Sequence, residues 1–258
     1  MVPPAEGVTL PTEGTEVVQG DDERRTGLVD EATLSIESSD PTVQRCATRS
    51  RTYALLAAGI EYPDRERLAT LGDRVWAEDL QAAVTAHPRS DLCREIDSEA
   101  LAPPKTEGEN LQIEYTRLFD VGGPGGPPCP LYGGTYGGDR TKTMEEVVRF
   151  YRYFGLRPDQ GMREPPDHLA TELEFLHFLT YRETQALLSG DDPVSLRRAE
   201  KDFIERHPGR WVPKLLARLD QQDPHRFYGA LLHALGHFLS AEAAYLREVA
   251  GPDEPSAT

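Results

Sequence analysis

The chain has 258 residues and a formal net charge of −16, from 44 acidic and 28 basic side chains. This charge argues against a nucleic-acid partner and against docking to anionic lipid, because both recruit basic surfaces. Mean hydropathy is −0.54, and no apolar stretch approaches the roughly 20 residues that a membrane span requires. Residues 1–20 lack a basic region followed by an apolar run, so we expect no secretory signal and a cytoplasmic location.

Cysteine and lysine usage refine this picture. The three cysteines, Cys46, Cys93 and Cys129, are odd in number and form no Cys-x-x-Cys pair, so neither a disulfide framework nor a cysteine-rich zinc site is indicated. Lysine is scarce beside arginine. Adaptation to high salt or a GC-rich genome would account for this bias and for the acidity equally well. The net charge therefore need not describe a partner.

The composition divides the chain into three parts. Residues 1–39 are rich in Glu, Asp, Gly, Thr and Ser, and we expect a disordered acidic tail there. Residues 251–258 resemble a short frayed end. Between them, residues 40–250 are expected to form one domain.

Residues typical of helix starts and helix ends recur through that domain. An N-cap residue precedes a proline at Asp40–Pro41, Asp192–Pro193 and Asp223–Pro224. Capping-box spacing occurs at Thr106–Glu109 and Thr143–Glu146. Glycines suited to helix ends are Gly59, Gly155, Gly190 and Gly251.

Apolar residues recur at helical spacing between these signals. The predicted helical segments lie within 43–57, 64–86, 90–102, 111–119, 144–154, 169–179, 193–207, 211–221 and 227–238. The segment 169–179 is apolar on more than one face, so we expect it at the centre of the bundle. No run of alternating β-branched residues is convincing. The sequence therefore predicts an all-α fold, a single helical-bundle domain of about nine helices.

One long connection interrupts the helices. Residues 120–140 contain eight glycines and four prolines, and a loop of this length inside a domain is usually functional or disordered. A phosphate-binding P-loop is not indicated, because Thr141 rather than glycine precedes Lys142. We expect a flexible connector and a natural hinge.

Two histidine patterns raise the alternative of a helical-bundle metalloenzyme. Glu174 and His177 have the Glu-x-x-His spacing of di-iron bundles, but no second such motif occurs. His233 and His237 have the spacing of a zinc-binding HExxH helix, but Ala234 stands where the general base would be. No Gly-x-Ser-x-Gly nucleophile motif is present, and nothing in the sequence demands an enzyme.

The segment Glu164–Leu169 joins two prolines to an acidic residue and a histidine. The prolines favour an extended entry, and Asp167 is suited to cap the helix that follows. A well-capped helix start is the simplest interpretation of this segment taken alone.

Over a longer span, the order of features is more specific. It comprises Glu114, Tyr115, Leu118 and Phe119, the Pro-rich loop with Tyr132, the run Met144–Leu156, Glu164–Leu169 and Glu172–Leu176. This constellation resembles the redox-enzyme maturation chaperones, the TorD/DmsD-like proteins grouped with the NarJ-type nitrate reductase delta-subunit chaperones. The similarity spans roughly residues 45–247.

The resemblance implies an all-helical, cytoplasmic and non-catalytic helper that carries no cofactor. Such helpers bind the apo catalytic subunit of a molybdopterin-containing oxidoreductase, often by its N-terminal leader, commonly a twin-arginine signal. They release it after cofactor insertion. The Asp-His pair that the family has at the hinge between its helical halves falls on Asp167 and His168. Two chain halves could exchange across such a hinge, so we expect a monomer or a domain-swapped dimer.

A leader with paired arginines and an apolar segment would need an apolar groove and a carboxylate rim. The expected client-binding residues are Tyr115, Phe119, Tyr132, Glu164, Asp167, His168, Glu172 and Glu174. A generic helical adaptor whose acidic surface binds a basic protein remains a second alternative.

Overall fold

The computed structural model describes residues 38–93, 96–156 and 164–251. Most of the predicted acidic tail and of the predicted C-terminal end lies outside these ranges. Within them the chain forms helices and no strand, with two isolated bridges, Gly123 to Gly126 and Tyr132 to His168. The all-α prediction is confirmed.

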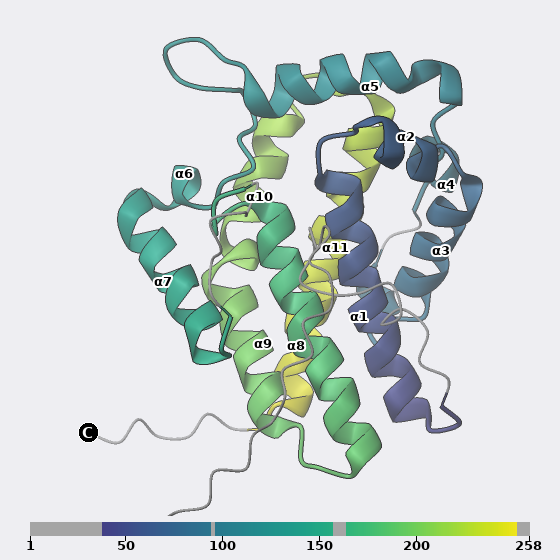
Figure 1. Cartoon of the computed structure of the whole chain (residues 1–258), viewed down its shortest axis with the longest axis vertical. Helices are drawn as coiled ribbons and strands as arrows, with labels where there is room; N and C mark the ends of the chain where they lie inside the picture. The colour runs from purple at the N-terminus through teal and green to yellow at the C-terminus, as the bar shows by residue number, and fades with distance from the viewer. Residues whose placement is uncertain (1–37, 94–95, 157–163, 252–258) are drawn as a thin grey trace, which may run out of the picture.

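The helices follow one another along the chain as labelled in Figure 1. Their bounds are α1 Pro41–Ile60, α2 Arg65–Leu71, α3 Arg74–Thr85, α4 Ser98–Leu101, α5 Gly108–Tyr115, α6 Gly134–Gly137, α7 Arg140–Tyr153, α8 Leu169–Ser189, α9 Val194–Arg206, α10 Pro208–Leu219 and α11 Arg226–Val249. Short 3-10 segments occur at Ser90–Leu92 and Lys105–Glu107, and a π-helical turn at Thr116–Asp120.

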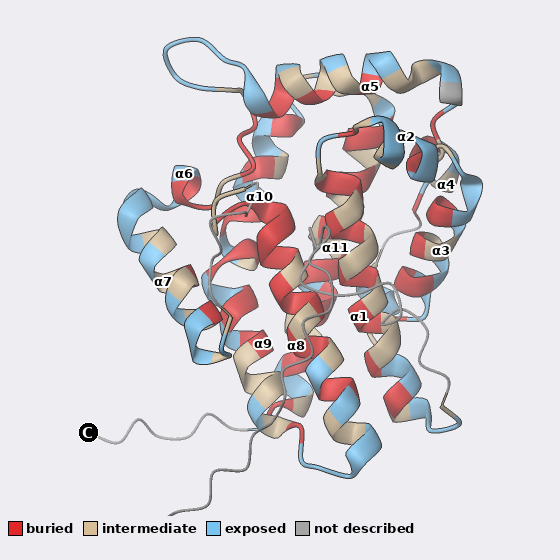
Figure 2. Cartoon of the chain, viewed as in Figure 1, coloured by how far each residue is buried: buried red, intermediate tan, exposed pale blue. Residues whose placement is uncertain are grey.

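Helix α8 lies in the middle of the bundle. It runs beside α1 and α9, and α11 crosses behind them, while α5 lies across one end and α7 flanks the side (Figure 1). Leu169, Leu173, Phe175, Leu176 and Leu179 of α8 are all fully buried, and the central helices carry most of the buried residues (Figure 2). The central position predicted for this segment is confirmed.

Several helix boundaries differ from the prediction. The start at Asp40 is confirmed, because its carboxylate accepts the Thr42 N–H at 2.7 Å. The two predicted capping boxes are wrong: α7 begins at Arg140 with Asp139 as its cap, and α5 begins at Gly108 without a side-chain cap. Asp139, which precedes Thr143 in the chain, is thus the cap of α7 in place of Thr143.

The predicted helix 64–86 is two helices. Asp73 interrupts it, because its carboxylate accepts the Val75 N–H at 3.2 Å and caps α3. Among the described residues of 90–102, a 3-10 turn and the four-residue α4 form in place of one helix. The loop 120–140 contains α6, so the described helices outnumber the nine predicted.

Gly59 does not end α1, as the sequence suggested, but lies inside its last turn. A Cβ at this position would lie 2.9 Å from Trp76 Cζ2 and 3.1 Å from Leu231 Cδ1. Glycine is needed there because α3 and α11 approach the α1 backbone closely.

A buried ionic network joins the four central helices. The guanidinium of Arg49 in α1 donates to Glu242 of α11 at 2.7 and 2.8 Å, to Glu183 of α8 at 2.7 Å, and to Glu200 of α9. All four side chains are at most 1% exposed. We call these residues the Arg49 network.

Groups around the Arg49 network complete its hydrogen bonds. Arg197 donates to Glu183 at 2.5 Å, and Tyr53 donates to Glu242 at 2.9 Å. His87 accepts the Arg89 N–H on Nδ1, so Nε2 carries the proton that it donates to Glu242 at 2.7 Å. Each central helix therefore has its register set by a polar contact as well as by packing.

Charge balance in the Arg49 network requires one neutral carboxyl. The pKa of Glu242 is lowered to about 2: burial opposes ionisation, but Arg49 and His87 together outweigh it. Burial instead raises the pKa of Glu200 well above its usual value, although Arg49 opposes this. Its Oε1 has no hydrogen-bond partner. We therefore expect Glu200 to be the carboxyl of the network that holds a proton at neutral pH.

A glutamine should replace this protonated glutamate without loss. The parent loses stability as pH rises above the unfolded pKa of Glu200, near 4.5, because the folded state retains a proton that the unfolded chain releases. Glu200→Gln should therefore match the parent near pH 4 and exceed it at pH 8 in the free energy of unfolding, measured by urea titration. Glu242→Gln should instead cost about 3–5 kcal/mol, because it leaves Arg49 short of an anion. Equal destabilisation by both variants would contradict the assigned proton.

No helix in the described ranges is long and apolar enough to cross a membrane.

Candidate functional site

The start of α8 is built from the Asp167–His168 pair. His168 is the N-cap residue: its Nδ1 accepts the Ala170 N–H at 3.2 Å. The prediction that Asp167 caps this helix is wrong. Because Nδ1 accepts, the ring proton of neutral His168 is on Nε2, which lies 4.0 Å from Glu164 Oε2. Burial lowers the pKa of His168 to about 4, so it is neutral at physiological pH.

Asp167 fastens the glycine-rich connection to α8. Its Oδ2 accepts the Gly134 N–H at 3.0 Å, and its backbone carbonyl accepts the Gly133 N–H at 2.8 Å. Leu169 N–H donates to the Leu131 carbonyl at 2.8 Å. A Cβ on Gly134 would lie 2.6 Å from Arg140 Cγ and 2.9 Å from Asp167 Oδ2. Glycine is required here for close approach.

The predicted flexible connector therefore has two different parts. Residues 121–126 are exposed and extend beyond the end of α5 (Figure 1). Residues 129–134 pack against α8 and are buried except for Tyr132. A hinge at 120–140 would have to break the contacts of Asp167 before this second part could move.

Glu172 lies under the same glycines. Its Oε2 accepts the Trp211 indole N–H at 3.0 Å, while burial raises its pKa well above the usual range. Glu172 Oε1 and Asp167 Oδ1 are buried and have no hydrogen-bond partner. Both side chains are fully buried, so neither presents a carboxylate at the surface in this arrangement.

The accessible part of the site surrounds Tyr132. Its hydroxyl donates to Glu164 Oε2 at 3.2 Å, its ring meets the His168 ring edge-on at a centroid distance of 5.2 Å, and the Arg140 guanidinium lies over it at 5.6 Å. The Glu164 side chain is 39% exposed. Burial, together with the neighbouring charge of Asp120, raises the pKa of Glu164. We call Asp120, Tyr132, Arg140 and Glu164 the Tyr132 surface; the ring of His168, which is buried, packs against it.

Tyr115 and Phe119 lie beneath this surface rather than on it. Each is 3% exposed, and their rings pack edge-on with each other at 5.0 Å and against Tyr228. Phe119 belongs to the π-helical turn, in which the Val121 N–H donates to the Thr116 carbonyl at 2.8 Å. Such turns are frequent at functional sites, and this one ends at Asp120.

Glu174 is half-buried on α8. Burial raises its pKa to about 7, although the charge of Arg67 in α2 opposes the shift. Two residues of an α-helix turn through about 200°, so Glu174 lies on another side of α8 from Glu172.

The residues of the metalloenzyme alternative do not meet. His177 Nδ1 contacts the Ser50 hydroxyl and carbonyl at 2.8 Å, while His233 contacts Asp220 at 2.9 Å on the surface. In the part of the chain that the structure describes, no three histidine, cysteine, aspartate or glutamate side chains are grouped to hold a metal ion.

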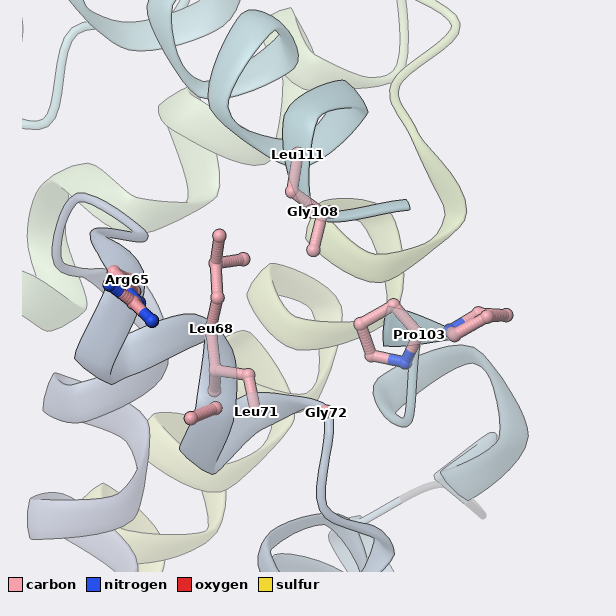
Figure 3. Close-up of a pocket in the computed structure, with 9 residues that line it drawn as sticks. Arg65, Leu68, Leu71, Gly72, Pro103, Gly108 and Leu111 are labelled. Carbon is pink, nitrogen blue, oxygen red and sulfur yellow. The ribbon is translucent and has the colours of Figure 1, made fainter. Parts of the chain in front are cut away.

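An apolar pocket of about 180 Å³ lies between α2, α5 and the segment Pro103–Pro104 (Figure 3). Leu68, Leu71 and Leu111 line it, and Arg65 lies at its edge. Sequence reasoning missed this pocket, and it missed Asp120 and Trp211 at the Tyr132 region. The two residues have no local motif, since their roles depend on segments distant in sequence.

Comparison with known proteins shows which class of protein the chain belongs to. The chain matches the family described as "Nitrate reductase delta subunit" over residues 78–217. It is 33% identical over 215 residues to the perchlorate reductase assembly chaperone protein of Dechloromonas aromatica (strain RCB), an alignment that covers 81% of this chain and 94% of the relative. It is 36% identical over 171 residues to the selenate reductase assembly chaperone protein of Thauera selenatis, covering 66% and 87%.

Two further matches are a sequence relative and a solved structure. The chain is 30% identical over 123 residues to the chaperone protein TorD of Vibrio parahaemolyticus serotype O3:K6, covering 46% of this chain and 55% of the relative. A solved structure of a putative redox enzyme maturation protein from Archaeoglobus fulgidus aligns over 83% of this chain and 98% of its own, with 20% identity and a TM-score of 0.45.

These relatives are named as chaperones, and the protein is of the enzyme-maturation chaperone class. It belongs to the nitrate reductase delta subunit family. The resemblance inferred from Glu114–Leu176 is confirmed.

Asp167 should prove structural as well as functional. Asp167→Ala removes the acceptor of the buried Gly134 N–H and should cost about 1–3 kcal/mol of unfolding free energy. Asp167→Asn retains an acceptor oxygen and should cost less. Urea unfolding of both variants measures the difference, and equal stability of Asp167→Ala and the parent would contradict the fastening role.

Proposed function

We propose that this protein is a dedicated cytoplasmic chaperone for the apo catalytic subunit of a molybdopterin-containing oxidoreductase. It would bind the subunit, chiefly by an N-terminal leader, and release it after cofactor insertion. The observation that carries this proposal is the match to the perchlorate reductase assembly chaperone protein over 94% of that relative's length.

The Tyr132 surface is the proposed site for leader arginines. Glu164 offers a partly exposed carboxylate suited to a guanidinium. Asp120 adds a second exposed carboxylate. Arg140 lies over the Tyr132 ring, and a client arginine would take this cation–π position by displacing it. The surface thus combines negative charge with an aromatic face.

The remaining site residues have supporting roles in this proposal. Asp167, His168 and Glu172 are buried and hold the backbone that carries Tyr132 and Glu164. Tyr115 and Phe119 support the π-helical turn that presents Asp120.

The apolar part of the leader would use the other side of the bundle. The charge of Arg67 in α2 acts on Glu174, and α2 is one of the helices that line the apolar pocket. That pocket, lined by Leu68, Leu71 and Leu111, is the proposed position of one apolar leader side chain. We retain a monomer or a domain-swapped dimer as the proposed oligomeric state, which light scattering measures directly.

Glu164→Gln should weaken leader binding without loss of folding. The variant still accepts from the Tyr132 hydroxyl but removes the charge that a guanidinium needs. A charge-assisted hydrogen bond is worth about 1.5–3 kcal/mol, so we expect at least about tenfold weaker binding of a synthetic twin-arginine leader peptide by calorimetry.

The matched control for this test is Glu109→Gln, an exposed glutamate of α5, which should leave leader affinity unchanged. A leader peptide with glutamine in place of both arginines should bind equally to the parent and to Glu164→Gln. Neither complex then contains the pair of Glu164 and a leader arginine. Equal loss with either leader would contradict a direct Glu164–arginine contact.

The whole-cell role makes a separate prediction. Deletion of the chaperone should lower both the activity and the molybdenum content of the client oxidoreductase, because the cofactor is inserted only into a held apo-subunit. Activity assays and elemental analysis of the purified client measure this, and unchanged molybdenum content would overturn the proposed function.

A further inference from the structure

The exposed face of α10 is basic on a strongly acidic protein. Arg210, Lys214 and Arg218 are exposed and recur at i, i+4 and i+8, so they lie along one side of the helix. The twelve residues Pro208–Leu219 contain no aspartate or glutamate. We call these three side chains the α10 basic stripe.

The opposite face of α10 fixes the orientation of the stripe. Trp211, Val212, Leu215 and Leu219 are buried at helical spacing. The helix cannot rotate without exposing these side chains, so the three cations must face outward.

Contacts with α6 hold two of the cations in place without neutralising them. Lys214 Nζ donates to the Tyr136 carbonyl at 2.9 Å, and the Arg218 guanidinium lies 4.7 Å from the centroid of the Tyr136 ring. The Tyr136 ring in turn stacks on Trp211 at 5.3 Å. The stripe is therefore preorganised, which reduces the entropy lost on binding.

No carboxylate of the described residues forms an ion pair with the stripe. Some other exposed arginines of the protein do have such partners: Arg117 pairs with Glu114, and Arg247 pairs with Glu205. Asp220, two residues beyond Arg218, contacts His233 instead at 2.9 Å. The three cations, two of them held by contacts with α6, thus remain available to an external anion.

We propose that the α10 basic stripe docks an acidic helical segment of a partner protein. Four residues of an α-helix rise about 6 Å, so glutamates at i, i+4 and i+8 of a partner helix would match the spacing of the three cations. The partner segment differs from the leader, whose arginines this stripe would repel, and the inference thus goes beyond the proposed function.

The overall charge favours a short acidic segment over a long polyanion. At −16, the protein repels nucleic acid or an anionic membrane along most of its surface, whereas a helix with three aligned carboxylates places its charge on the stripe alone. The ordinary screening of surface charges by salt makes this contact sensitive to ionic strength.

The test is calorimetric titration with a synthetic alanine-rich helical peptide that carries glutamates at i, i+4 and i+8. The full chain should bind it at low salt at least about tenfold more tightly than the same peptide with glutamines, as expected for a few exposed ion pairs. High salt should remove the difference. Arg210→Glu with Lys214→Glu should abolish the preference, and so should the milder Arg210→Gln with Lys214→Gln.

The matched control is Arg45→Glu with Arg74→Glu. These arginines are exposed on α1 and α3, and the pair of substitutions changes the net charge by the same amount as the charge reversal on α10. The control should retain the preference for the glutamate peptide. Equal loss in both double variants would overturn the proposal, since general repulsion would then account for the loss.

Two further readouts distinguish an acidic helix from a phosphate ligand, and a local effect on α10 from a general binding defect. Stronger competition by inorganic pyrophosphate than by the glutamate peptide would overturn the proposal in favour of a phosphate ligand.

The stripe variants should also keep the parent's affinity for the twin-arginine leader, because Glu164 is unchanged. A stripe variant that lost leader binding as well would show a general defect and overturn the separate role of α10.

Discussion

The arrangement of this protein depends on the burial of Arg49 among three glutamates. One guanidinium binds α8, α9 and α11 to α1, and an ion of this kind is costly to bury unless every partner is in place. The four helices must therefore meet in one register. Arg49 and Arg197 can balance only two carboxylates, so a proton on Glu200, whose pKa burial raises, would remove the surplus negative charge. The position of α8, and hence of its N-terminus, follows from this constraint.

At the start of α8, where the functional region lies, buried polar contacts again join separate segments of the chain. Asp167 binds the glycine-rich segment, Glu172 binds Trp211 of α10, and His168 caps the helix while its ring supports Tyr132. These contacts connect α6, α8 and α10 across a small volume. A client segment that binds at the Tyr132 surface would therefore act on groups directly linked to the basic stripe on α10, through Trp211 and Tyr136. Two partner segments of opposite charge would thus contact one connected framework.

Much of the fold could be predicted from local pattern, because helical periodicity and caps are properties of neighbouring residues. The central place of 169–179, the cap at Asp40 and the stop at Gly190 follow from such patterns. The capping boxes at Thr106 and Thr143 were wrong, since any Thr-x-x-Glu has the spacing but only tertiary packing decides where a helix begins. The role of Gly59 was misassigned for the same reason: contact with Trp76 and Leu231, not helix termination, requires it.

For the site, sequence order alone was enough to indicate the family and to single out Tyr132, Glu164, Asp167 and His168, which do lie together. By itself the sequence determined the all-helical class, the acidic character and the identity of the residues around the start of α8. Only the tertiary structure decided which of those residues are accessible. Asp167 and Glu172 lie beneath Gly133 and Gly134, Tyr115 and Phe119 lie in the core, and Glu164 remains at the surface. The reason is physical: burial and the pKa shifts that follow from it depend on contacts between segments far apart in the chain, and local pattern does not encode those contacts.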